Sequence, residues 1–212
     1  MVRIPNHTLS VLLGRLVPVT GYGRNVENIF RQANVGRKRK VISERTILRE
    51  KIKICNDFTR AFQGTGLFNK TFPSYGETGT GYKKAISLIM DQAITGSYPH
   101  SRISYQHVLV SKGLLPGAVK AAAADNEEHN ILFSWGDNTG TGNAKATDMV
   151  ILVAYFPVLK QVIYSIDAIR KDCRAHLETN TMEGHNAETW IGFISADEKD
   201  AADSRYTGTI YL

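Results

Sequence analysis

The segment SWGDNTGTGNAK (134–145) has the composition of a loop that could bind phosphate or calcium, because it combines three glycines with Asp and Asn side chains. Its spacing fits neither site. No glycine precedes Lys-Ser or Lys-Thr, as a Walker A loop requires, and the Gly140-x-Gly142 pair lacks the third glycine of a dinucleotide fingerprint. Asp137 lacks the acidic partners of an EF-hand. We therefore predict a loop between two strands, with Asp137 or Asn138 forming turns.

A second candidate is electrostatic, because four consecutive basic residues precede a predicted helix whose exposed face is also basic. Such a surface could bind the phosphates of a nucleic acid or an acidic protein, or could simply be solvated. Aromatic residues for base stacking are few in this region. The residues predicted to contact a partner or nucleic acid are Arg37, Lys38, Arg39, Lys40, Arg45, Arg49 and Lys53.

Catalytic and metal-binding patterns are missing from the sequence. The six histidines form no HxH, HxxxH or HExxH pair, and no GxSxG motif marks a nucleophile, although a triad assembled from distant residues stays open. The two cysteines, Cys55 and Cys173, lie far apart and suit neither a disulfide framework nor a metal site. We expect no catalytic residue, no metal and no cofactor, and therefore no enzyme.

The composition suits a globular protein with a strong charge asymmetry. The 212 residues are 42% hydrophobic and 22% charged, with a net charge of +6. Residues 1–60 carry a net +9, whereas residues 61–212 carry −3. The apolar run Leu9–Leu13 is too short for a signal peptide, and no run is long enough to cross a membrane. We expect a cytoplasmic assembly or a virion rather than secretion.

Two helices are predicted after a basic N-terminal arm, residues 1–42, which has few apolar residues with which to form its own core. In residues 43–63, Leu48, Ile52, Cys55, Phe58 and Phe62 recur at helical spacing and form one apolar stripe. Ser43 suits the N-cap of this helix and Gly64 its end. A second amphipathic helix is predicted at about 81–95. The arm should be held by the rest of the chain or by neighbouring subunits.

From residue 101 the hydrophobic pattern alternates with a period of two. The predicted strands lie in RISYQHVLV, NILFSW, DMVILVAYF, KQVIYSI, CRAHLE, TWIGFISA and YTGTIYL, with 111–118 and 121–130 as longer connections. About seven short strands of this kind are typical of an immunoglobulin-like β-sandwich. The predicted fold is thus α+β, with a basic arm at 1–42, a two-helix segment at 43–97, and an antiparallel immunoglobulin-like β-sandwich at 98–212.

Four phrases between residues 95 and 199, namely TGSYP, SKGLLPGA, FSWGDNTGTG and FISADEK, resemble a Bacteroidota domain family of unknown function. The resemblance is strongest over residues 75–212. It implies a Bacteroidota lineage and the sandwich fold, but no activity. The sequence departs from that family at two turns, where Glu198 and Cys173 occupy positions at which we expect glycine.

We expect a non-enzymatic structural or assembly protein whose partners are neighbouring protein subunits, the preferred case being a phage or phage-derived particle. The alternatives are a nucleic-acid-binding protein that uses the basic arm and a surface recognition module. No membrane span is expected.

Overall fold

The structure is a computed structural model. It describes residues 43–73, 79–126, 130–179 and 182–212 with their side chains, and it describes four short strands before residue 43 by their backbone alone. The chain divides into two compact units, Met1–Ser43 and Glu44–Leu212. The first unit carries a net charge of +7 and the second a net charge of −1. The charge asymmetry of the sequence therefore follows the division between the units.

The described part of the first unit is an antiparallel sheet with the strand order β1-β4-β3-β2. Its strands are β1 (Val2–Pro5), β2 (Gly14–Leu16), β3 (Val19–Arg24) and β4 (Glu27–Gln32). Leu16 ends β2 and Val19 begins β3, so these two residues belong to different strands. The apolar run Leu9–Leu13 lies outside the described residues.

The second unit begins with the helices α2 (Glu44–Gln63), α3 (Leu67–Thr71) and α4 (Gly81–Leu88), followed by a single π-helical turn at Ile89–Ala93. The prediction of α2 is confirmed. The second helix begins as predicted, where the Thr80 side chain accepts a hydrogen bond from the Lys83 backbone N–H, but its α-helical part ends at Leu88. The short helix α3 lies between Gly66 and the start of α4.

Two larger antiparallel sheets follow the helices, with the strand orders β10-β9-β12-β13 and β11-β8-β7. Between the helices and these two sheets lies a short antiparallel pair of strands, β5 (Ile94–Thr95) and β6 (Arg102–Ile103), each two residues long. The strands of the larger sheets are β7 (Val119–Asn126), β8 (Asn130–Gly136), β9 (Met149–Phe156), β10 (Gln161–Ser165), β11 (Arg174–Leu177), β12 (Asn186–Ile194) and β13 (Arg205–Tyr211).

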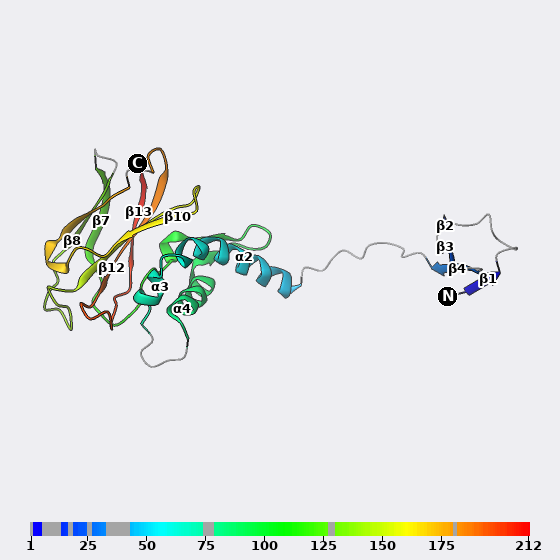
Figure 1. Ribbon diagram of the computed structural model, residues 1–212, viewed down its shortest axis with the longest axis horizontal. Helices are drawn as coiled ribbons and strands as arrows, with labels where there is room; N and C mark the ends of the chain where they lie inside the picture. Colours follow the sequence, from blue (N-terminus) through cyan, green and yellow to red (C-terminus); the bar gives the residue numbers. More distant parts are fainter. Residues whose placement is uncertain are drawn as a thin grey trace. The chain divides into compact units, whose positions relative to one another are not determined.

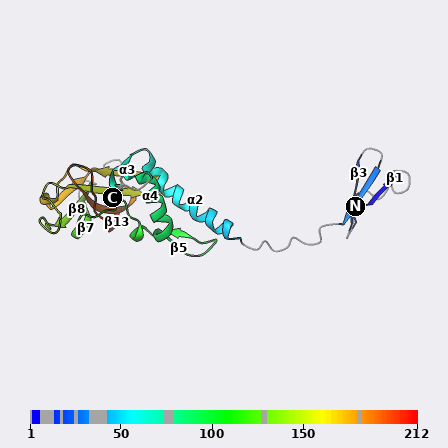
Figure 2. The same ribbon diagram turned by 90° about the horizontal axis from the view of Figure 1, so that it is seen from below.

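The four-stranded sheet is covered on both faces, which explains why β9 reads as an unbroken apolar run. Along β9, Leu152 and Phe156 face a core shared with the three-stranded sheet, whereas Val153 and Tyr155 face a second core shared with the helices. The helices gather on one side of the sheets (Figures 1 and 2). The unit therefore has three layers, in the order helices, four-stranded sheet and three-stranded sheet, and the mixed α+β class is confirmed.

Two strand predictions are wrong. Residues 121–130, expected as a connection, contain most of β7, which pairs with β8. Its run of alanines has weak β-propensity, so pairing with β8 rather than local preference decides its conformation. Conversely, RISYQHVLV forms only the two residues of β6, a 3₁₀ turn at Tyr105–His107 and an irregular segment.

Candidate functional site

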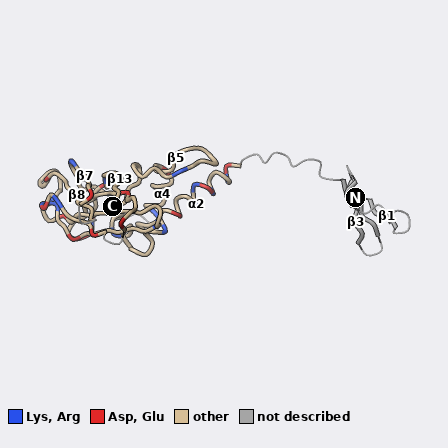
Figure 3. The backbone as a smooth tube through the Cα atoms, turned by 90° about the horizontal axis from the view of Figure 1, so that it is seen from above, with Lys and Arg blue, Asp and Glu red and all other residues tan. Residues whose placement is uncertain are grey.

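Helix α2 carries a basic stripe of exposed side chains. Arg45, Arg49, Lys53 and Arg60 are all exposed, and their spacing places them along one side of the helix. Figure 3 marks the basic and acidic positions along α2 in blue and red. Within the part of the chain that the structure describes, none of the four forms an ion pair. The stripe is therefore available to an anionic partner.

The structure brings together only some of the predicted contact residues. Arg45, Arg49 and Lys53 lie together on α2, and Arg60 extends their row, although the prediction of contact residues did not include it. The four basic residues Arg37 to Lys40 lie outside the described residues.

Next to the basic stripe, α2 exposes an apolar ridge formed by Leu48 and Ile52. These side chains are 49% and 38% exposed, whereas Cys55 and Phe58 of the same apolar stripe are buried. The first turns of α2 extend beyond the two larger sheets, which the helix covers only with its second half (Figures 1 and 2). The β5–β6 pair lies beside this part of α2, where the Ser101 hydroxyl donates to Glu50 at 3.0 Å. The predicted apolar stripe thus exists, and its first two members are exposed.

The glycine-rich loop after β8 is a structural connection, as predicted, and it closes around a buried arginine. Arg170 is fully buried, and its guanidinium contacts Asp148 at 3.1 and 3.2 Å and Asn138 at 2.6 Å. It also donates to the Pro116 carbonyl and lies 3.7 Å above the centre of the Phe193 ring. Asp137 accepts from the Thr139 backbone N–H in the predicted Asx turn. Sequence reasoning missed Arg170, which no motif marks.

Two turns that carry unexpected side chains have left-handed backbone. Cys173 has φ 59° and Glu198 has φ 55°, conformations that glycine adopts at the lowest cost. These are the two positions at which the family resemblance leads us to expect glycine. The turn geometry is retained although the side chains differ.

A cluster of tyrosines surrounds a buried carboxylate near the helices. Glu188 accepts hydrogen bonds from the hydroxyl groups of Tyr206, at 2.5 Å, and Thr209, at 3.1 Å. Burial, and then the nearby Tyr155, Glu188 and Tyr206, raises the pKa of Tyr105 to about 12. These tyrosines therefore stay protonated at neutral pH.

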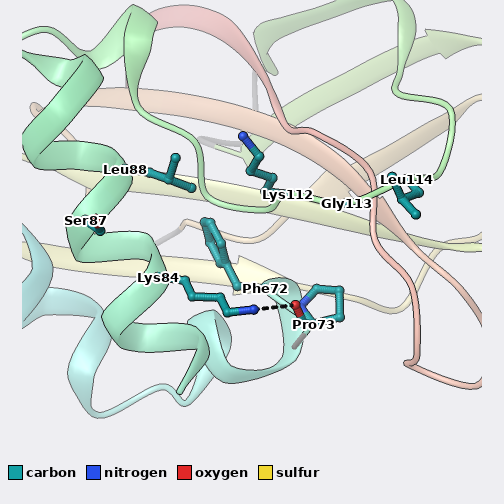
Figure 4. Close-up of a pocket in the computed structure, with 8 residues that line it drawn as sticks. All are labelled: Phe72, Pro73, Lys84, Ser87, Leu88, Lys112, Gly113 and Leu114. Carbon is teal, nitrogen blue, oxygen red and sulfur yellow. Dashed lines mark hydrogen bonds between the residues drawn. The ribbon is translucent and has the colours of Figure 1, made fainter. Parts of the chain in front are cut away.

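A cavity of about 420 Å³ opens beside α4. Its walls come from the end of α3, from α4 and from the segment after the 3₁₀ turn. Figure 4 shows Phe72 standing between Lys84 on one side and Leu88 with Lys112 on the other. The lining residues are Phe72, Pro73, Lys84, Ser87, Leu88, Lys112, Gly113 and Leu114.

Over the described ranges, no group of three or more His, Cys, Asp or Glu side chains is arranged to hold a metal ion. A helix with the length and hydropathy of a membrane span is likewise not found among the described residues.

Residues 31–208 match the sequence pattern of DUF6266, a family of unknown function. The chain belongs to this family. The match begins before α2, so it includes the basic segment and the helices. The resemblance seen in the sequence was strongest only from residue 75 onward. No curated protein and no solved structure matches the chain. The Bacteroidota lineage stays a prediction.

Proposed function

We propose that this DUF6266 chain is a non-enzymatic assembly subunit that binds further copies of itself through the first half of α2. The observation that carries the proposal is the exposed apolar ridge of Leu48 and Ile52, which continues the buried face of the same helix. An amphipathic helix is stabilised by burying its apolar face, and here the second unit buries only half of it. The ridge is suited to the centre of a larger contact.

The basic side chains beside the ridge restrict the kind of surface that it can meet. Two whole chains each carry a net charge of +6 and repel one another, so any electrostatic attraction between copies has to be local. Arg45 and Arg49 beside the ridge favour an acidic surface of the neighbouring copy. The phage particle, as one setting for such an assembly, stays a prediction.

The immunoglobulin-like sandwich forms part of the proposal. If strands β7 to β13 are lettered A to G, the two sheets read E-B-A and D-C-F-G. In a constant-type immunoglobulin domain, strand D pairs with E rather than with C. The order here supports a related sandwich in which the fourth strand has changed sheets, an architecture shared by many recognition and assembly modules.

The mass of the full chain in solution tests the proposal. Sedimentation equilibrium is expected to show association that increases with concentration and weakens about 30-fold in Leu48→Gln/Ile52→Gln, from the loss of roughly 2 kcal/mol of apolar burial. Val158→Gln is the matched control, because Val158 is 76% exposed on the β9–β10 turn and lies outside the ridge of Leu48 and Ile52. A wild-type monomer at all concentrations, or equal effects of the two variants, would count against the proposal.

Nucleic-acid binding is the second candidate, favoured by the four cations of α2, which form no ion pair with any described residue. If Arg45, Arg49 and Lys53 each contact a phosphate, replacing all three with Gln should reduce the slope of log affinity against log salt by about 2.7. Between about 50 and 200 mM salt, the affinity of the wild type for a DNA duplex should then fall by a factor about 40 times larger than the affinity of the variant does.

Fluorescence anisotropy with labelled duplex measures these affinities. The control variant neutralises three exposed cations on other elements, namely Lys120, Lys171 and Arg174. An unchanged salt slope in the α2 variant would exclude this candidate, whatever the control does.

A further inference from the structure

We propose that the cavity between α3, α4 and residues 112–114 binds a small apolar carboxylate, meaning an aliphatic or aromatic acid. This site is independent of the assembly contact on α2. Its volume of about 420 Å³ lies in the range of pockets that hold small ligands.

The cavity is chemically suited to an acid with an apolar body. Phe72, Leu88 and Leu114 supply apolar surface, and Leu114 is 75% exposed at its rim. Lys84 and Lys112 supply two ammonium groups, and among the described residues that line the cavity none is acidic. The Lys112 side chain is exposed and has no hydrogen bond or ion pair with any described residue. A carboxylate beside Lys112 would gain a charge-assisted hydrogen bond while the rest of the ligand covers apolar surface.

The wall that carries Lys112 is already held in place. The Lys112 backbone N–H donates to the Thr71 carbonyl at 3.0 Å. The next two backbone N–H groups, of Gly113 and Leu114, donate to the carboxylates of Asp203 and Asp200. These contacts tie the wall to α3 on one side and to the β12–β13 loop on the other. Because the wall is fixed before the ligand arrives, binding costs little ordering.

The opposite wall is formed where α3 and α4 meet. The Lys84 side chain reaches the Pro73 carbonyl at 3.5 Å across the mouth of the cavity (Figure 4). Gly81 begins α4 so close to α3 that a Cβ at this position would lie 2.2 Å from the Phe68 carbonyl oxygen. Close contact between the two helices therefore sets the width of the cavity.

Titration of isotope-labelled full chain, followed by amide NMR, tests the inference. Octanoate is expected to shift the amides of Gly113 and Leu114 in a saturable way at millimolar concentration, and octanol to bind far more weakly. Acetyl-Gly-Leu with a free carboxylate, set against its amide, tells whether the terminal residue of a peptide is accepted as well. Binding of either acid in preference to its neutral analogue supports the proposal.

Two lysine variants on the full chain locate the site. Lys112→Gln should weaken octanoate binding about tenfold or more, since a charged hydrogen bond is lost. Lys83→Gln is the matched control, because Lys83 is an exposed lysine on α4 that does not line the cavity, and its affinity should equal the wild-type value. The inference is overturned if neither acid gives a saturable shift, if the neutral analogues bind equally well, or if Lys112→Gln binds the acid like the wild type.

Discussion

Replacing Asp148 by Asn should destabilise the second unit severely, because it leaves the buried guanidinium of Arg170 without its counter-charge. Asp148 and Arg170 are 1% and 0% exposed. Burial lowers the pKa of Arg170, and Asp148 opposes that shift. The amide keeps the shape of the carboxylate but cannot balance the charge.

The magnitude follows from the contacts. Arg170 makes two contacts with Asp148, and one each with Asn138 and the Pro116 carbonyl. Only the first two involve a carboxylate. Breaking a buried pair from one side costs about 3 to 5 kcal/mol, which corresponds to a fall of about 6 to 20 °C in Tm for a domain of this size.

Urea unfolding followed by tryptophan fluorescence measures this cost, since the Trp135 ring N–H donates to the Arg170 carbonyl at 2.7 Å. Asp137→Asn is the matched control, because Asp137 acts on Arg170 from an exposed position of the same loop where solvent screens its charge, so the unfolding midpoint should change much less. Arg170→Met completes a double-mutant cycle, in which the double variant should lose at least about 1 kcal/mol less than the sum of the single variants. A cost below about 1 kcal/mol for Asp148→Asn, or additive costs, would refute the reasoning.

Three further predictions concern single side chains. In a Cys173→Ser chain, Cys55 should react with Ellman's reagent only on unfolding, because burial raises its pKa to about 11; fast labelling of the native chain would contradict its placement. Burial raises the pKa of Tyr105 from 10.0 to about 12, so the unfolded chain releases this proton at a lower pH than the folded chain does. The free energy of unfolding should therefore fall as the pH rises between these two pKa values. If the free energy of unfolding of Tyr105→Phe falls as steeply with pH, Tyr105 is not the cause. Cys173→Gly should raise Tm by about 2 °C by relieving left-handed strain, and a lower Tm would show that the cysteine side chain contributes packing.

Local patterns in the sequence predicted the elements that bury their own apolar residues. Helix α2 and the strands β8, β9 and β12 carry strong periodic or continuous apolar signals, and all four are present. Strand β7 was missed because its alanines carry almost no signal, and its pairing with β8 is a tertiary effect. The prediction for the segment after β6 is wrong in the opposite way. Its apolar and polar side chains alternate as in a strand, but only Arg102–Ile103 form one.

The candidate surfaces show the same limit. Helical spacing alone places Arg45, Arg49 and Lys53 on one side of α2. Sequence reasoning could not tell that Leu48 and Ile52 would extend past the sheets, because that depends on where the body of the unit ends. The cavity brings Lys112 close to Phe72, which lies forty positions earlier in the chain, and no linear motif marks it.

The most direct test of the assembly proposal is to identify what covers the ridge of α2 in solution. A photo-crosslinking amino acid in place of Leu48, in a mixture of isotopically light and heavy full chains, allows mass spectrometry to separate contacts between copies from contacts within one. We expect mixed light–heavy crosslinks that map to one surface of a neighbouring copy and disappear at high dilution. Crosslinks found only within a single chain, to residues 1–43 for example, would contradict it.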